Sequence, residues 1–133
     1  MGALWRWLKR RRKQRPQQVS NVKTEIDEMA KNVTLVWVLP TRRTGGALLP
    51  PEEIDRVDLE ISVDGGVSFT PVRSFMPDEE QSNLFPDLEV GNWQFGLTVF
   101  DTAGRSSGQL VFEVLVADDS PPNQVSGVTA IQD

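Results

Sequence analysis

Residues 92–99 alternate between polar and apolar side chains, and this pattern restricts the fold more than any other feature of the chain. A strand that is buried on one face needs a two-residue period, because successive side chains point to opposite faces of a sheet. Gly91 precedes the pattern, and the residues from Asp101 to Gly104 that follow it are typical of a turn. The apolar side chains that are expected to face a core are Trp93, Phe95, Leu97 and Val99.

Further strands are predicted on both sides of this one. Regular alternation is found in residues 32–39, 54–63 and 109–117. Shorter or less regular strands are expected at residues 18–27, 69–75 and 84–85. The last strand has apolar residues on both faces, including Val111 and Leu115, so it is expected to meet something outside the core. The side chains predicted to point inward are Val33, Leu35, Trp37, Leu39, Val57, Leu59, Ile61, Val63, Leu110, Phe112, Val114 and Val116.

Residues 62–69 predict a tight hairpin. Asp64-Gly65-Gly66 is a strong turn signal, because glycine tolerates the positive φ that short hairpin turns need. The run Ser62-Val-Asp-Gly-Gly-Val-Ser-Phe69 also resembles the Asp-box motif, in which the aspartate side chain caps the turn. One copy of the motif, without the repeats of about 40–50 residues that form a propeller, predicts a hairpin and not a glycosidase.

Residues 17–117 resemble a fibronectin type III domain. The resemblance rests on the strand around Trp37, on Leu88, Gly91 and Trp93, and on the loop Asp101-x-x-Gly104-x-Ser106. It implies an all-β fold, a seven-stranded antiparallel β-sandwich with Trp37 in its core. The family usually has a tyrosine where this chain has Trp93, and the tyrosine hydroxyl bonds back to the backbone. The indole N–H of Trp93 could donate in its place.

The composition excludes several kinds of active site. The chain has no cysteine and no histidine, so it has no Ser-His-Asp triad, no cysteine nucleophile and no zinc site. No pair of carboxylates is marked as an acid and a base. We therefore expect a non-enzymatic protein with no cofactor, no metal and no small-molecule substrate.

Charge divides the chain into a basic arm, residues 1–16, and an acidic remainder. The arm carries seven of the 14 Lys and Arg residues and none of the 19 Asp and Glu residues. No apolar run reaches the ~18 residues that a membrane span needs, and the cations follow the first apolar residues, unlike in a signal peptide. The arm is interpreted either as a solvated tail or as an anchor. The residues predicted to contact a partner are Trp5, Arg6, Trp7, Leu8, Arg10, Arg11, Arg12 and Lys13.

The Pro-rich tail, residues 118–133, contains an echo of the start of the sandwich. Pro122-Asn-Gln-Val-Ser-Gly-Val128 matches Pro16-Gln-Gln-Val-Ser-Asn-Val22 in five of its residue types. One interpretation is that Pro-rich linkers resemble one another. The other is a spare strand in which Val125 and Val128 add to the sheet edge of a neighbouring subunit.

Four functions are consistent with these features. The first is a structural or decoration component of a large assembly, such as a bacteriophage virion made in the host cytoplasm, with capsid, portal or tail proteins as partners and self-association as an option. The second is a protein at the cytoplasmic face of a membrane, held by the arm. The third is a nucleic-acid contact confined to the arm. The fourth is a carbohydrate-binding accessory module, which rests on fold analogy alone.

Overall fold

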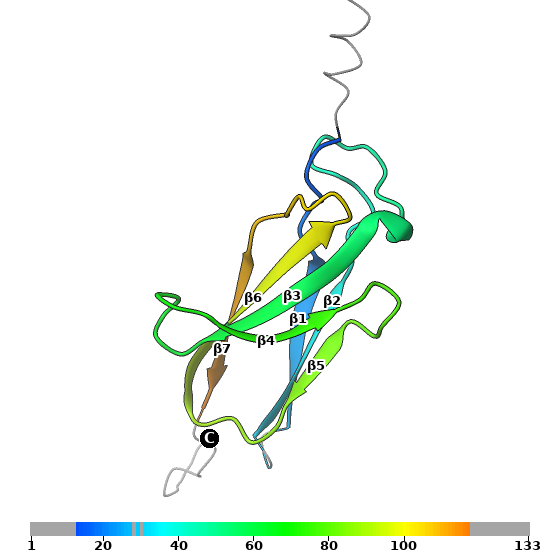
Figure 1. Cartoon of the computed structure of the whole chain (residues 1–133). Coiled ribbons are helices and arrows are strands. Elements are labelled where there is room, and N and C mark those ends of the chain that lie inside the picture. Colours follow the sequence, from blue (N-terminus) through cyan, green and yellow to red (C-terminus); the bar gives the residue numbers. More distant parts are fainter. Residues whose placement is uncertain (1–12, 28, 30, 118–133) are drawn as a thin grey trace, which may run out of the picture.

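Seven antiparallel strands form two sheets that face each other (Figure 1). This is a computed structural model, and it describes residues 13–27, 29 and 31–117. The predicted seven-stranded β-sandwich is confirmed. The first sheet has the order β1 (Ser20–Asp27), β2 (Asn32–Val38) and β5 (Ser82–Phe85). The second has the order β4 (Thr70–Phe75), β3 (Ile54–Ser62), β6 (Gly91–Asp101) and β7 (Leu110–Val116), and a short 3-10 helix, η1 (Pro51–Glu53), precedes β3.

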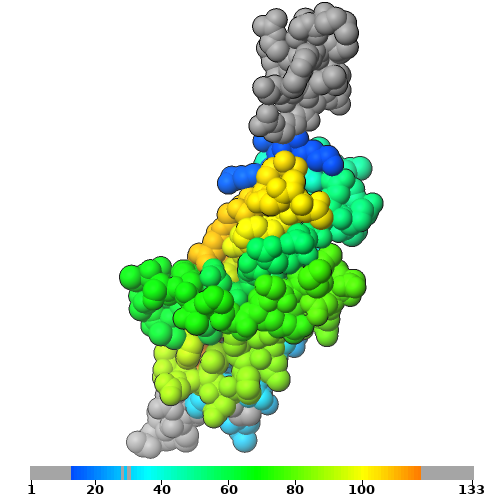
Figure 2. Space-filling view, in the orientation of Figure 1, coloured from blue at the N-terminus to red at the C-terminus, as the bar shows by residue number. Residues whose placement is uncertain are grey.

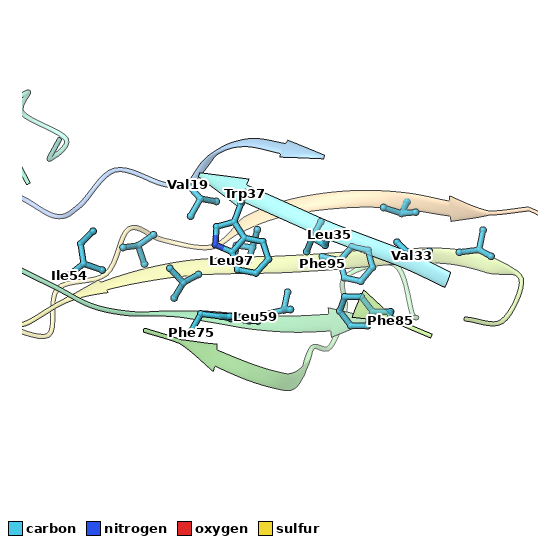
Figure 3. Packing of buried hydrophobic residues seen from close by; sticks show 14 of the residues in the cluster. Val19, Val33, Leu35, Trp37, Ile54, Leu59, Phe75, Phe85, Phe95 and Leu97 are labelled. Carbon is cyan, nitrogen blue, oxygen red and sulfur yellow. The ribbon is translucent and has the colours of Figure 1, made fainter. Parts of the chain in front are cut away.

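Trp37 lies in the core between the two sheets, as predicted (Figure 3). Its side chain is only 4% exposed, and its ring meets Phe75 of the opposite sheet edge to face at 5.0 Å. The indole N–H donates to the side chain of Gln81 at 2.8 Å, so the one polar atom of this core residue has a partner. A large aromatic with a satisfied donor therefore joins the two layers.

The alternating residues of β6 also face the core. Phe95, Leu97 and Val99 are fully buried, and Trp93 packs against the buried cluster from its margin. β6 pairs with β3 on one side and with β7 on the other, which makes it a central strand of its sheet. The indole N–H of Trp93 does donate to the backbone, because it bonds to the carbonyl of Glu89 at 2.9 Å.

The prediction for the end of β3 was wrong. Val63 was expected to point inward, but it is 66% exposed, whereas Ser62 is buried. The strand ends at Ser62 because its hydroxyl accepts a hydrogen bond from the backbone N–H of Gly66 and donates to Asp64, which turns the chain one residue early. Asp64 caps the turn as expected, by accepting from the backbone N–H and the hydroxyl of Ser68. These hydrogen bonds hold the pKa of Asp64 well below its usual range.

We expect Trp37→Ala to lower the free energy of unfolding by about 3–5 kcal/mol, the range for removing a large buried aromatic side chain. Urea denaturation of the full chain measures this. Val38→Ala is the matched control, because Val38 is the exposed neighbour on the same strand, and it is expected to change stability by no more than about 0.5 kcal/mol. Equal stability of the two variants would contradict the assignment of Trp37 to the core.

Candidate functional site

Four segments meet at the end of the sandwich where residues 13–17 lie: this N-terminal segment, the loop 41–49, η1 and the turn 101–105. Figure 2 shows the blue N-terminal residues and the yellow turn that follows β6 together at this end. The segments are joined by the side chain of Arg43, which is only 2% exposed. A charged residue at this depth requires partners on all sides.

Arg43 donates to three acceptors, each in a different segment. One terminal nitrogen, Nη1, donates to Asp101 Oδ2 and to the backbone carbonyl of Gln14, both at 2.9 Å. The other, Nη2, donates to Glu53 Oε1 at 2.6 Å. The remaining nitrogen, Nε, is buried without a hydrogen-bond partner. The guanidinium therefore fixes the turn, η1 and the N-terminal segment relative to one another.

Asp101 is the buried counter-charge of Arg43. Its carboxylate also accepts from Arg105 Nε at 3.0 Å and from the backbone N–H groups of Ala103 and Arg105 at 3.0 and 2.8 Å. Burial alone would raise the pKa of Asp101, but these hydrogen bonds outweigh burial and lower it. Burial opposes the charge on Arg43 in the same way, and its bonds to Asp101 and Glu53 outweigh burial and raise its pKa. Both groups stay charged at neutral pH.

Backbone contacts hold the N-terminal segment against the loop 41–49. Pro16 is buried and forms a β-bridge with Arg43. The N–H of Gln17 donates to the carbonyl of Arg42 at 3.1 Å, and the N–H of Thr44 donates to the carbonyl of Arg15 at 2.9 Å. Residues 13–16, which the sequence analysis assigned to the arm, therefore contact the sandwich and are held against this end of it.

Among the predicted partner-binding residues, only Lys13 lies in the part of the chain that the structure describes. Its Nζ donates to Glu53 Oε1 at 2.9 Å, the same oxygen that Arg43 contacts. Hydrogen bonds from Lys13 and Arg43 lower the pKa of Glu53. The other predicted contacts stay predictions because they lie outside the described residues: Trp5, Arg6, Trp7, Leu8, Arg10, Arg11, Arg12, Val125 and Val128.

Sequence reasoning missed the site at Arg43. It gave Arg43 no role, and it placed Asp101 only in the turn that follows residues 92–99. The two residues are 58 positions apart, and neither belongs to a periodic pattern. The two adjacent cations Arg42 and Arg43 in a remainder of net negative charge were an available signal.

The structure gives a physical reason for four residues of the segment that the tail repeats. Pro16 and Val19 are buried, and Val22 packs against the core. Asn21 has a φ of 50°, in the left-handed region that asparagine and glycine tolerate best. The tail has proline, valine and valine at the corresponding positions, and it has Gly127 where β1 has Asn21. The repeat therefore keeps the residues by which the start of β1 binds its sheet.

Metal-binding clusters and membrane-spanning helices are both absent from residues 13–27, 29 and 31–117. In that described part of the chain, no group of three or more His, Cys, Asp or Glu side chains is placed to hold a metal ion. No helix there is long and apolar enough to cross a membrane.

The fold resembles that of fibronectin type III domains of known structure. An fn3 domain of the human collagen α-1(XX) chain matches with a TM-score of 0.57 and 16% identity, over 80% of this chain and 90% of the other. Titin domains A168–A170 match with a TM-score of 0.55 and 17% identity, over 77% of this chain but only 32% of the titin fragment. No protein-family model and no curated protein sequence matches the chain. At these identities the similarity shows the fold alone.

We expect Arg43→Met to lower the free energy of unfolding by about 3 kcal/mol near neutral pH, because it leaves Asp101 buried without its main partner. Folding lowers the pKa of Asp101 and of Glu53, so in acid the unfolded chain binds more protons than the folded chain. The two carboxylates therefore contribute fully to the free energy of unfolding above about pH 4, near their pKa values in the unfolded chain. This contribution is lost as the pH falls through their lower pKa values in the folded chain. The variant should therefore lose stability less steeply below about pH 4 than the parent.

Urea denaturation at a series of pH values measures both effects of the Arg43 substitution. Arg42→Met is the matched control, because Arg42 is exposed and its side chain donates only to the carbonyl of Gly46. If both variants had the same stability and the same dependence on pH, Arg43 would not hold this end of the sandwich together.

The double substitution Gln17→Asn with Asn21→Gly makes residues 16–22 identical in sequence to residues 122–128 of the tail. Since Gly adopts a positive φ without strain, stability should stay within about 0.5 kcal/mol of the parent. Asn21→Ala is the contrasting variant, and it should cost about 1 kcal/mol because alanine disfavours this φ. Thermal unfolding distinguishes the variants. A large loss of stability in the double variant would mean that the tail sequence cannot replace residues 16–22 in the sandwich.

Proposed function

We propose that this chain is a non-enzymatic interaction module of a large assembly, a structural component of a bacteriophage head or tail, anchored by its N-terminal arm and displaying the sandwich. The observation that carries the proposal is the rigid attachment of residues 13–17 to the sandwich through Arg43. An anchor transmits a fixed orientation only if the chain is held where it leaves the body. A buried guanidinium bonded to the backbone of Gln14 provides that constraint.

The chemistry of the arm defines the partner surface. Trp5, Trp7 and Leu8 would enter an apolar pocket, and the cations from Arg10 to Lys13 would meet carboxylates or phosphates around it. In this proposal the partner with such a surface is a capsid, portal or tail protein. Tryptophan and arginine are the residues that most often dominate binding energy at protein interfaces, which supports a protein partner.

The tail supplies a second contact in this proposal. Val125 and Val128 would add to the edge of a sheet in a neighbouring copy, with the tail backbone forming the ladder hydrogen bonds. β7 is an edge strand, and its outward residues Val111 and Leu115 are exposed. The exposed Val111 and Leu115 beside the edge of β7 would pack against Val125 and Val128 of an added tail strand.

The arm also favours a second candidate function, contact with a nucleic acid or an anionic membrane surface. Seven cations without an acid would bind phosphate groups in a salt-dependent manner. The acidic remainder of the chain would repel the same surface, so any such contact would be confined to the arm.

Deleting residues 2–12 is expected to reduce co-sedimentation of the protein with virus particles by at least about tenfold, which corresponds to the loss of roughly 1.4 kcal/mol of binding free energy. The truncated protein should still fold into the sandwich and unfold in one cooperative transition, because the deletion leaves every contact of Arg43 in place. Particle preparations assayed by sedimentation and immunodetection give the measurement.

Three further variants show which residues of the arm and the tail are needed for attachment to particles. Replacing Arg10, Arg11 and Arg12 with glutamine tests the cations, and replacing Trp5 and Trp7 with alanine tests the apolar contact. Val125→Pro removes one donor from the tail and bars the ladder there. If the protein without residues 2–12 attached normally to particles, the arm would not be the anchor. Attachment of the full chain to phospholipid vesicles or DNA instead of particles would favour the second candidate.

A further inference from the structure

An open groove of about 570 Å³ lies between η1 and the turn that connects β4 to β5. In Figure 1 these are the coil that leads into β3 and the green turn on the same side of the molecule. The groove is lined by four apolar residues and three acidic residues. We call the apolar lining the floor, which is Pro51, Ile54, Met76 and Pro77, and the acidic lining the rim, which is Glu52, Asp55 and Asp78.

The groove is held open by the hydrogen bonds of its turn. The backbone N–H of Met76 donates to Glu79 Oε1 at 2.7 Å, and its carbonyl accepts from Gln81 Nε2 at 2.9 Å. The Met76 side chain is left 49% exposed, and two prolines stiffen the surrounding backbone. Methionine is a flexible, polarizable side chain that adapts well to aromatic ligands. The floor is therefore a preformed surface for a large apolar group.

The rim has unused negative charge. Within residues 13–117, neither the Glu52 nor the Asp78 side chain takes part in an ion pair, whereas Asp55 is paired with Arg56 at 2.7 Å. A ligand that combines aromatic side chains with several cations would fill this groove. By contrast, a groove beside β1, lined by Lys23, Val36 and Val38, has no carboxylate and would not attract such a ligand.

The arm of this chain has that chemistry. Residues 4–12 combine two tryptophans and two leucines with five cations. The arm also approaches the groove from a fixed point, because Lys13 is bonded to Glu53, which directly follows Glu52 of the rim. An extended chain advances about 3.3 Å per residue, so nine residues reach across roughly 30 Å. Both the tether and the length place the groove within reach.

We propose that residues 4–12 dock into this groove of their own chain when the protein is free. The inference rests on the proposed function, since it uses the same arm and assigns it a resting position before attachment. Docking would shield the tryptophans from water and pair the cations with Glu52 and Asp78. Attachment to an assembly would then exchange one apolar, acidic site for another.

Methionine methyl NMR of the free full chain tests the docking. The chain has three methionines, of which Met76 lies in the groove and Met29 is 93% exposed on the turn between β1 and β2. Deleting residues 2–12 is expected to shift the Met76 methyl signal and leave that of Met29 unchanged, because a tryptophan ring shifts only nearby protons. An unchanged Met76 signal would overturn the proposal.

Limited trypsin digestion of the free protein is the second test. Cleavage within residues 6–12 reports the undocked fraction, so Glu52→Lys with Asp78→Lys should accelerate it about tenfold. Glu25→Lys with Glu80→Lys is the matched control, because it reverses two exposed charges that do not line the groove. Equal cleavage rates for the two double variants would overturn the proposal. Protection that increases with protein concentration would also overturn it, because the arm would then occupy the groove of a neighbouring copy. Neither readout uses particles, so its failure is distinguishable from failure of the anchor.

Discussion

The buried ion pair between Arg43 and Asp101 sets the arrangement of the end of the sandwich where residues 13–17 lie. Removing two charges from water is costly, and such a pair seldom adds much net stability. Here Asp101 receives several hydrogen bonds and Arg43 reaches three acceptors, so both charges are compensated. The result is geometric, because one side chain fixes three segments that are far apart in the sequence.

The strands of the sandwich core position both Arg43 and Asp101. β2, which carries Trp37, leads into the loop of Arg43, and β6, which carries Phe95 and Leu97, ends at Asp101. The contact between Trp37 and Phe75 holds the two sheets at a fixed separation, so the strand ends are fixed as well. The apolar core between the sheets thus positions the charged cluster of Arg43, Glu53 and Asp101.

Sequence periodicity predicted the strands because burial on one face imposes it, and Trp37 and Phe95 were correctly assigned to the core for that reason. It failed at Val63, where the hydrogen bonds of Ser62 and Asp64 end the strand and override the alternation. It had no means of finding Arg43, because ion pairs between loops leave no period in a sequence. Local patterns therefore predicted the scaffold, whereas the site depends on contacts between distant segments.

The repeated segment limits where the tail can bind. It keeps the residues that hold the start of β1, but in another copy that position is already occupied by Pro16, Val19 and Val22. A tail that displaced them would gain contacts equal to those lost and would also lose the freedom of a separate chain. Among the described strands only β6 pairs with β7, so the other edge of β7 has no described strand to displace, and exposed apolar side chains lie beside it. For a contact between two complete copies, the β7 edge is therefore the better acceptor.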